Sequence, residues 1–449
     1  MMWEHFKTGL LAFLVVVSML LTYALWSYQP SLENTQGPST ISEETTLDAD
    51  QKKPSELFIP SNVIFHYNGD HLGIDKGQED KLFNRIQQWP LSDFTKNINL
   101  TEVMKETSIE MEFATSLPLE FFANTLAYNG EEEIPQFEFN RIFIDFEKGS
   151  SVKNIYFVSD NEDETESVSA TIKTNFYSDV YQTFINEGNA FSLLTFTGKD
   201  GEIIYVPEDE RTLTTYTYRD NQLDVDPLKN ILFSNPEIVK PSDYLPGETF
   251  YSDGSLEITV NKNTNVLQYK GLLNDETNTL RKQELLEISY NFTNDHRGFT
   301  GSNERDDSFK VFYLNDFRDN DIVYRRYLNH YPSFDENGIT ELYMSFDSSK
   351  VSPNRYVRPM IKLSIIAKDE ETVRAGQDVL SYIEQSDMYE SEKVEGLLIG
   401  YYLEKRPGNE GYYDASPGWF IKQAGSDWER IIFPSDSEAG GDNDAVESN

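Results

Sequence analysis

The sequence predicts an α+β fold: an N-terminal transmembrane helix followed by a multi-domain ectodomain of antiparallel sheets with packed helices. Three observations predict it. One long apolar stretch lies near the start of the chain. Strand-like alternation and helical periodicity are interspersed along the remainder without a regular β-α-β order. The length of 449 residues exceeds what one ordinary hydrophobic core accommodates.

The apolar stretch predicts an uncleaved membrane anchor. Residues 8–32 contain no charged side chain, and residues 9–26 are almost wholly apolar. At about 1.5 Å per residue this helix spans roughly 27 Å, close to the hydrocarbon thickness of a bilayer. Its apolar side chains favour insertion by about 5 kcal/mol. The alternative is a cleaved signal peptide, but the stretch is long for one and residues 23–28 lack a small-x-small cleavage signal.

Flanking charges predict the orientation. Lys7 precedes the apolar stretch, and the first base after it is the distant Lys52. By the positive-inside rule the N-terminus is cytoplasmic and the body is outside, which predicts a single-pass protein of the cell membrane. The net charge of −39 arises from 77 acidic and 38 basic residues and lies beyond the apolar stretch. Such a body repels nucleic acid, so we expect no nucleic-acid partner.

One face of the predicted membrane helix is a candidate partner-binding surface. Five residues recur at 4-3-4-3 spacing and share this face: Leu11, Val15, Ser18, Thr22 and Leu25. Ser18 and Thr22 lie one turn apart, which permits close helix approach and interhelical hydrogen bonds. Ordinary membrane-helix composition explains the same spacing, so the pattern alone leaves both interpretations open.

Composition divides the chain into seven segments. Residues 29–57 are rich in Ser, Thr, Glu, Asp and Pro and predict a disordered stalk, and residues 435–449 predict a disordered acidic tail. Breaks near residues 200 and 300 divide the rest. The predicted segments are a cytoplasmic N-terminus (1–7), the transmembrane helix (8–28), the stalk (29–57), three ectodomains (58–200, 201–300, 301–434) and the tail (435–449).

Local patterns place the elements of the ectodomain. Alternation or β-rich runs predict strands at residues 109–113, 137–146, 154–158, 167–172, 203–206, 213–218, 256–260, 309–313, 342–346, 358–366 and 396–403. Helical periodicity predicts helices at residues 79–88, 118–127, 178–186, 279–291 and 371–385.

The chain contains no motif that indicates catalysis, a cofactor or a metal. It has no cysteine, which excludes disulfides, thiol catalysis and cysteine-ligated zinc. The five histidines form no cluster with ligand spacing. A metal site at His66, Asp70 and His71 is conceivable, but a surface loop is the better interpretation. No nucleotide-binding fingerprint or nucleophile elbow is present.

Three short strings resemble the site of penicillin-binding enzymes and are rejected. S-x-x-K, S-D-N and K-T-G begin at Ser150, Ser159 and Lys7. That chemistry needs the serine and lysine one turn apart on a helix, whereas Ser150 follows a predicted strand. Lys7 lies on the cytoplasmic side. We therefore expect no enzyme activity.

Several segments in order resemble the YycH family of membrane-anchored regulators. The N-terminal stretch carries part of the resemblance, from Trp3 to Lys7 and through Leu21-Thr22-Tyr23-Ala24-Leu25-Trp26-Ser27-Tyr28-Gln29-Pro30. It continues at residues 232–236 (Leu-Phe-Ser-Asn-Pro), 250–255 (Phe-Tyr-Ser-Asp-Gly-Ser), 294–299 (Asn-Asp-His-Arg-Gly-Phe) and 415–420 (Ala-Ser-Pro-Gly-Trp-Phe). The acidity of the stalk and tail departs from the family pattern.

The resemblance implies three α+β domains after the stalk, the last two related to the ectodomain of a sister protein, YycI. It implies a non-enzymatic regulator that acts with YycI on the sensor histidine kinase YycG (WalK) of the YycFG (WalRK) two-component system, which controls cell-wall metabolism. It also implies that transmembrane helices carry much of the contact. The alternative function is a membrane-anchored extracytoplasmic module that binds or senses a ligand.

Overall fold

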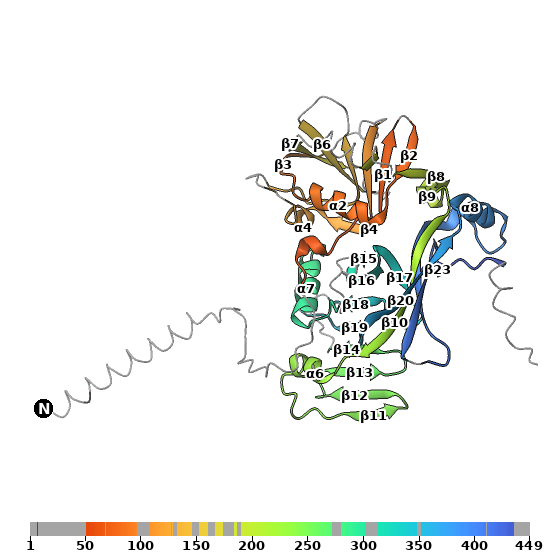
Figure 1. Cartoon of the computed structure of the whole chain (residues 1–449). Coiled ribbons are helices and arrows are strands. Elements are labelled where there is room, and N and C mark those ends of the chain that lie inside the picture. Colours follow the sequence, from red (N-terminus) through yellow and green to blue (C-terminus); the bar gives the residue numbers. More distant parts are fainter. Residues whose placement is uncertain are drawn as a thin grey trace, which may run out of the picture. The chain divides into compact units, whose positions relative to one another are not determined.

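The computed structural model describes Lys7 and most of the chain after residue 50: residues 51–67, 69–96, 107–126, 128, 133–145, 152–159, 167–173, 184–185, 190–271, 280–300, 312–347, 352–409 and 411–434. Residues 47–449 form one compact unit, separate from residues 1–46. The helices and strands below all belong to that unit, and Figure 1 shows their arrangement. The predicted transmembrane helix at residues 8–28 and the tail at 435–449 lie outside the described residues. No helix in the described part is long and apolar enough to cross a membrane.

The fold class is confirmed as mixed α and β, with mostly antiparallel sheets. A nine-stranded sheet comes first in the chain, in the order β3-β7-β6-β5-β4-β1-β2-β8-β9. Its strands are β1 (Asn62–Tyr67), β2 (Asp70–Gly73), β3 (Leu91–Lys96), β4 (Thr107–Pro118), β5 (Glu138–Asp145), β6 (Val152–Val158), β7 (Ser167–Lys173), β8 (Phe191–Thr197) and β9 (Ile203–Pro207).

Helices α2 (Lys76–Ile86) and α4 (Leu119–Ala123) pack together against this sheet (Figure 1). The i, i+3, i+4 spacing of apolar residues in α2 turns Leu82, Phe83 and Ile86 into the core. Phe122 of α4 packs edge-on against Phe139, with ring centroids 5.0 Å apart. Such edge-to-face pairs are favoured by the aromatic quadrupole. The alternation that predicted β4 to β7 therefore faces a core that is rich in phenylalanine.

A second sheet of fourteen strands follows, with the main order β11-β12-β13-β14-β19-β18-β16-β17-β21-β22-β10-β20. All its pairings are antiparallel except the parallel pair β17–β21. The strands are β10 (Arg211–Gln222), β11 (Ser242–Leu245), β12 (Glu248–Ser252), β13 (Glu257–Asn261), β14 (Val266–Lys270), β15 (Phe312–Arg318), β16 (Asp321–Leu328), β17 (Tyr331–Phe334), β18 (Glu341–Ser345), β19 (Arg355–Pro359), β20 (Ile361–Val373), β21 (Val394–Lys405), β22 (Tyr412–Gln423) and β23 (Glu429–Arg430).

Three helices accompany the second sheet: α6 (Asp226–Leu232), α7 (Lys282–Asp295) and α8 (Gly376–Gln385). Helix α7 starts with Glu284 accepting a hydrogen bond from the Arg281 backbone N–H, and it buries Leu285 and Leu286. Helix α8 begins where Gly376 meets the carbonyl of Pro207, so closely that a Cβ at position 376 would clash with it. Because of this close approach, only glycine fits there.

Three of the four segments of the second half that resemble the YycH family lie at element ends or turns of this fold, and the fourth lies within a strand. Residues 232–236 end α6, 250–255 turn from β12 into β13, and 294–299 end α7. Residues 415–420 lie within β22. In the second of these turns, the Asp253 carboxylate accepts hydrogen bonds from the backbone N–H groups of Ser255 and Leu256.

Two predicted elements differ from the structure in type or number, and a third falls almost wholly outside its described residues. The helix predicted at 371–385 begins only at Gly376, because the preceding residues extend β20 by pairing with β10. The strand predicted at 358–366 is two strands, β19 and β20, separated by Met360. The helix predicted at 178–186 lies almost wholly outside the described residues.

Residues 51–57, which belong to the predicted stalk, join the folded body. Lys52 donates a backbone hydrogen bond to the Asn294 side chain, and its ammonium donates to the Phe312 carbonyl. Leu57 is fully buried. The ordered body therefore starts before residue 58.

Candidate functional site

The candidate site is a cavity of about 790 Å³ that we call the central cleft. Residues of both sheets line it, from β1, β4, β5 and β9 of the first and from β16, β17, β18 and β21 of the second. Its volume is that of a small-molecule or peptide site rather than of a packing defect.

Polar contacts tie the two sheets together beside the cleft. The imidazole of His330, just before β17, pairs with Asp80 of α2, and Arg211 at the start of β10 pairs with Asp75. The backbone N–H of Leu314 donates to the Leu57 carbonyl at 2.8 Å. These contacts join segments far apart in sequence, so the cleft depends on the tertiary fold.

A buried charge cluster lies behind the wall formed by the first sheet. Glu110 on β4 is fully buried, and its carboxylate accepts from Arg141 Nε at 2.6 Å and pairs with His66 Nε2 at 2.8 Å. His66 and His71 face each other across the β1–β2 hairpin, with their Nδ1 atoms 2.9 Å apart. The ring of Tyr205 packs edge-on against both imidazoles.

The electrostatics of this cluster favour a charged Glu110. Burial alone would raise the pKa of Glu110, but the hydrogen bond from His66 and the charge of Arg141 together hold its pKa below the usual range. Burial and the adjacent His66 lower the pKa of His71. The cluster therefore keeps one buried carboxylate ionised beside a cation that also faces the cleft.

Two carboxyls that line the cleft have the opposite behaviour. Glu79 of α2 is almost completely buried, and burial raises its pKa to about 7 despite the Lys76 ammonium 3.0 Å away. Burial, reinforced by the neighbouring Glu110, raises the pKa of Glu112 to about 7. Glu112 accepts a hydrogen bond from the Asn62 amide at 2.9 Å. The side of the cleft formed by α2 and β4, which carries Glu79 and Glu112, therefore gains negative charge as the pH rises through neutrality.

The titration of Glu79 predicts a pH-dependent stability. Its folded-state pKa is raised from 4.5 to about 7, so the folded state binds more protons than the unfolded state between those values. The stabilisation is complete below about pH 4.5 and is lost as the pH rises through about 7. We expect Glu79→Gln, which resembles the protonated form, to reduce the fall in unfolding free energy between about pH 5 and pH 8 by about 2 kcal/mol.

Urea unfolding of the full-length chain in detergent, followed by tryptophan fluorescence, measures this effect. Glu210→Gln, at an exposed position, is the matched control and should leave the pH profile unchanged. An unaltered profile in Glu79→Gln would show that Glu79 ionises at an ordinary pH.

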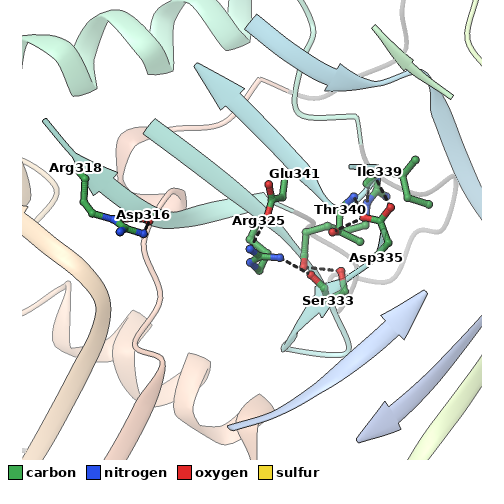
Figure 2. A network of polar contacts seen from close by, with 9 residues as sticks. Asp316, Arg318, Arg325, Ser333, Asp335, Ile339, Thr340 and Glu341 are labelled. Atoms are coloured by element: carbon green, nitrogen blue, oxygen red, sulfur yellow. Dashed lines mark hydrogen bonds and ion pairs between the residues drawn. The ribbon is translucent and has the colours of Figure 1, made fainter. Parts of the chain in front are cut away.

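The second-sheet wall carries a network around Arg325 of β16, shown in Figure 2. Arg325 is nearly buried, pairs with Glu341 of β18 and donates to the carbonyl of Ser333 at 3.0 Å. Its guanidinium lies 4.4 Å from the ring centroid of Phe334. Within the described chain, its buried Nε has no hydrogen-bond partner.

A tight loop next to this network shapes the rim between β17 and β18. Asp335 accepts a hydrogen bond from the backbone N–H group of Asn337. It also accepts from the backbone N–H groups of Ile339 and Thr340, which Figure 2 labels. The Thr340 hydroxyl donates to the same carboxylate at 2.7 Å. These four hydrogen bonds to the Asp335 carboxylate hold the loop in place.

Among the histidines, the loop interpretation of His66 and His71 is wrong, because they lie opposite each other on paired strands. Asp70 is exposed at the strand end. The described part of the chain holds no group of three metal-ligating side chains.

The other candidates concern residues outside the described part. These are the predicted transmembrane face (Leu11, Val15, Ser18, Thr22 and Leu25) and Ser150. The cleft itself was not predicted. A sequence feature that could have indicated it is the pair Glu110 and Glu112 within an otherwise apolar strand. Carboxyl groups in such a strand become buried and then need polar partners.

The structure defines the class of protein: an α+β protein whose two mostly antiparallel sheets enclose a polar cleft. Family models then identify the chain. The YycH protein N-terminal domain matches residues 4–187, and the YycH protein C-terminal domain matches residues 202–438. The chain therefore belongs to the YycH family.

Relatives agree with this assignment along nearly the whole length. The Two-component system WalR/WalK regulatory protein YycH of Bacillus subtilis (strain 168) is 21% identical over 450 residues, covering 94% of this chain and 95% of that protein. The crystal structure of YycH from Bacillus subtilis matches with a TM-score of 0.68 at 17% identity. It covers 86% of this chain and 98% of that structure, and it shows a shared fold.

Proposed function

We propose that this protein is a non-enzymatic, membrane-anchored regulator of the sensor histidine kinase YycG (WalK), with its body outside the cytoplasm. The observation that carries the proposal is the end-to-end match to the Bacillus subtilis regulator of the WalR/WalK system. In this proposal a YycI-like membrane protein is a second partner, and the regulated output is cell-wall homeostasis.

The proposed mechanism uses the predicted membrane helix. Leu11, Val15, Ser18, Thr22 and Leu25 form the surface that packs against helices of the kinase and of the YycI-like protein. Small hydroxyl-bearing residues at one-turn spacing support close helix packing and hydrogen bonds in the bilayer. The helix shifts the kinase between two arrangements only by the difference in its affinity for them.

The test enlarges the two small residues of the face. We expect Ser18→Leu with Thr22→Leu to reduce regulation of the response regulator's phosphorylation by about 5-fold or more, the range of a coupling of about 1–3 kcal/mol. The measurement is phosphorylation of the WalR-type response regulator in cells that carry each variant.

The matched control is Val17→Leu with Ala24→Leu, two enlargements on the opposite side of the same predicted helix. Equal effects of the two double variants would contradict a specific face. A release of the chain into the medium without its first segment would contradict the anchor itself.

A second candidate function, a ligand-binding module, is favoured by the central cleft. It does not exclude the first, because a ligand in the ectodomain can bias the same kinase equilibrium. Regulation retained by a chain that lacks residues 58–434 would contradict a role for the cleft.

A further inference from the structure

Two histidines of the β1–β2 hairpin bring ring nitrogens to a single point. His66 of β1 and His71 of β2 are register partners, next to the pair Tyr67–Asp70 that closes the hairpin. Side chains directly opposite each other on antiparallel strands have Cβ atoms about 4.5–5.5 Å apart, within reach of a shared ligand. The two Nδ1 atoms lie 2.9 Å apart, and the ring planes are nearly perpendicular, at 85°.

The contact with Glu110 fixes which nitrogen of His66 carries a lone pair. The Nε2 atom of His66 lies 2.8 Å from the Glu110 carboxylate, whose pKa is held low. An ionised carboxylate only accepts hydrogen bonds, so Nε2 of His66 carries a proton. In the neutral imidazole the lone pair is then on Nδ1, the atom that faces His71. Histidines that bind metals commonly donate their other N–H to a carboxylate in this way.

A metal ion can take the place of the proton between the two rings. A shared proton satisfies the two facing Nδ1 atoms, since two lone pairs or two N–H groups at 2.9 Å would repel each other. A cation at this point accepts both lone pairs, and His71 then carries its proton on Nε2. The bound state of both imidazoles is therefore one that the neutral side chains already allow.

The separation of the two nitrogens indicates the kind of metal. Nitrogen ligands about 2.0–2.1 Å from a metal and 2.9 Å from each other subtend an angle of about 90°. Tetrahedral zinc would need nitrogens about 3.3 Å apart at the same bond length. An angle of about 90° is that between neighbouring ligands in a square-planar or tetragonal site, the geometry that copper(II) and nickel(II) prefer.

The surroundings favour a cation and allow it to enter. The His66 side chain is 13% exposed, and His71 is half-buried. The carboxylates of Glu110 and Asp70 both favour positive charge at His71. Tyr205 packs edge-on against the two rings, with centroids 5.8 and 5.2 Å away, and limits their rotation. Because the described residues hold no third metal-ligating side chain there, water completes the coordination.

We propose that His66 and His71 together bind one copper(II) ion through their Nδ1 atoms, with Glu110 orienting His66 from its other nitrogen. Copper(II) is the divalent first-row ion that such nitrogen sites bind most tightly. The ion ties β1 to β2 beside Tyr205, which also lines the central cleft. This goes beyond the proposed action on the kinase.

The first test is calorimetric titration of the untagged full-length chain in detergent with copper(II) chloride. We expect one tight equivalent, which His71→Gln weakens at least about tenfold. This substitution leaves the contact of His66 with Glu110 in place. His330→Gln is the matched control, because His330 is also half-buried but pairs with a single carboxylate, Asp80. It should leave the copper affinity unchanged.

The second test is electron paramagnetic resonance of the copper-loaded chain, which needs no variant. We expect superhyperfine splitting from two imidazole nitrogens, reduced to one nitrogen in His71→Gln. Protons compete with the metal for the same lone pairs, so the affinity should also fall as the pH is lowered below about 6.5.

Three results would overturn the proposal. They are the lack of a tight equivalent, a spectrum from oxygen ligands or from one nitrogen in the unmodified chain, and equal affinity of His71→Gln and the unmodified chain. The second of these stands even if His71→Gln does not fold. Because no kinase is present, these results are independent of the membrane-helix test.

Discussion

Replacing Glu110 by alanine is expected to lower the free energy of unfolding by about 3–5 kcal/mol. Glu110 is fully buried and is the partner of both Arg141 and His66. Removing it leaves a largely buried guanidinium without its carboxylate, at a cost much greater than that of a surface pair. The same change leaves Glu112 beside Arg141 without the repulsion of Glu110, so the pKa of Glu112 should fall.

Chemical denaturation at neutral pH measures the loss. Glu390→Ala breaks an exposed pair with Lys393 and is the matched control, with an expected change below about 0.5 kcal/mol. Joint replacement of Glu110 and Arg141 by leucine should recover part of the loss, because no unpaired charge then remains. A loss equal to that of Glu390→Ala would contradict the cluster as described.

Replacing Arg358 by methionine is expected to cost about 3 kcal/mol. Arg358 of β19 is fully buried and donates to the carbonyls of His296 and Arg297 and to the Thr300 hydroxyl. These acceptors follow the end of α7, where a helix leaves its last carbonyls unsatisfied. Methionine fills similar volume but leaves them without a donor, so the segment after α7 should also open locally.

Denaturation together with hydrogen exchange over residues 292–300 measures both effects. Arg358→Lys keeps a charge but presents one compact ammonium in place of the planar fork, so most of the loss should persist. A stable methionine variant with unchanged exchange would show that Arg358 does not hold the end of α7.

Much of the secondary structure could be predicted from local patterns. The alternation of Ile109, Met111 and Phe113 predicts β4, and the apolar spacing of Leu82, Phe83 and Ile86 predicts α2, because in each case one face enters a core. The second half of β20 could not be predicted in this way. Its exposed, charged residues have no apolar alternation, and only the ladder with β10 holds them extended.

The candidate site, like the secondary structure, could be predicted only in part from the sequence. The sequence places Glu110 and Glu112 on one side of a strand, but it does not indicate that this side is covered. Covering it requires Arg141 from β5 and the histidines of the β1–β2 hairpin. Likewise, no local pattern links Asp80 to His330, which lie 250 residues apart in the chain.

The sequence by itself determined the mixed α+β class, about half of the strands and the strong acidity, because each depends on residue type and short-range periodicity. Only the tertiary structure decided which charged groups are buried, which of them titrate near neutrality and which residues of the two sheets line one cleft. The physical reason is that burial and pairing are set by surfaces that distant segments bring together, and a pattern within one segment does not contain that information.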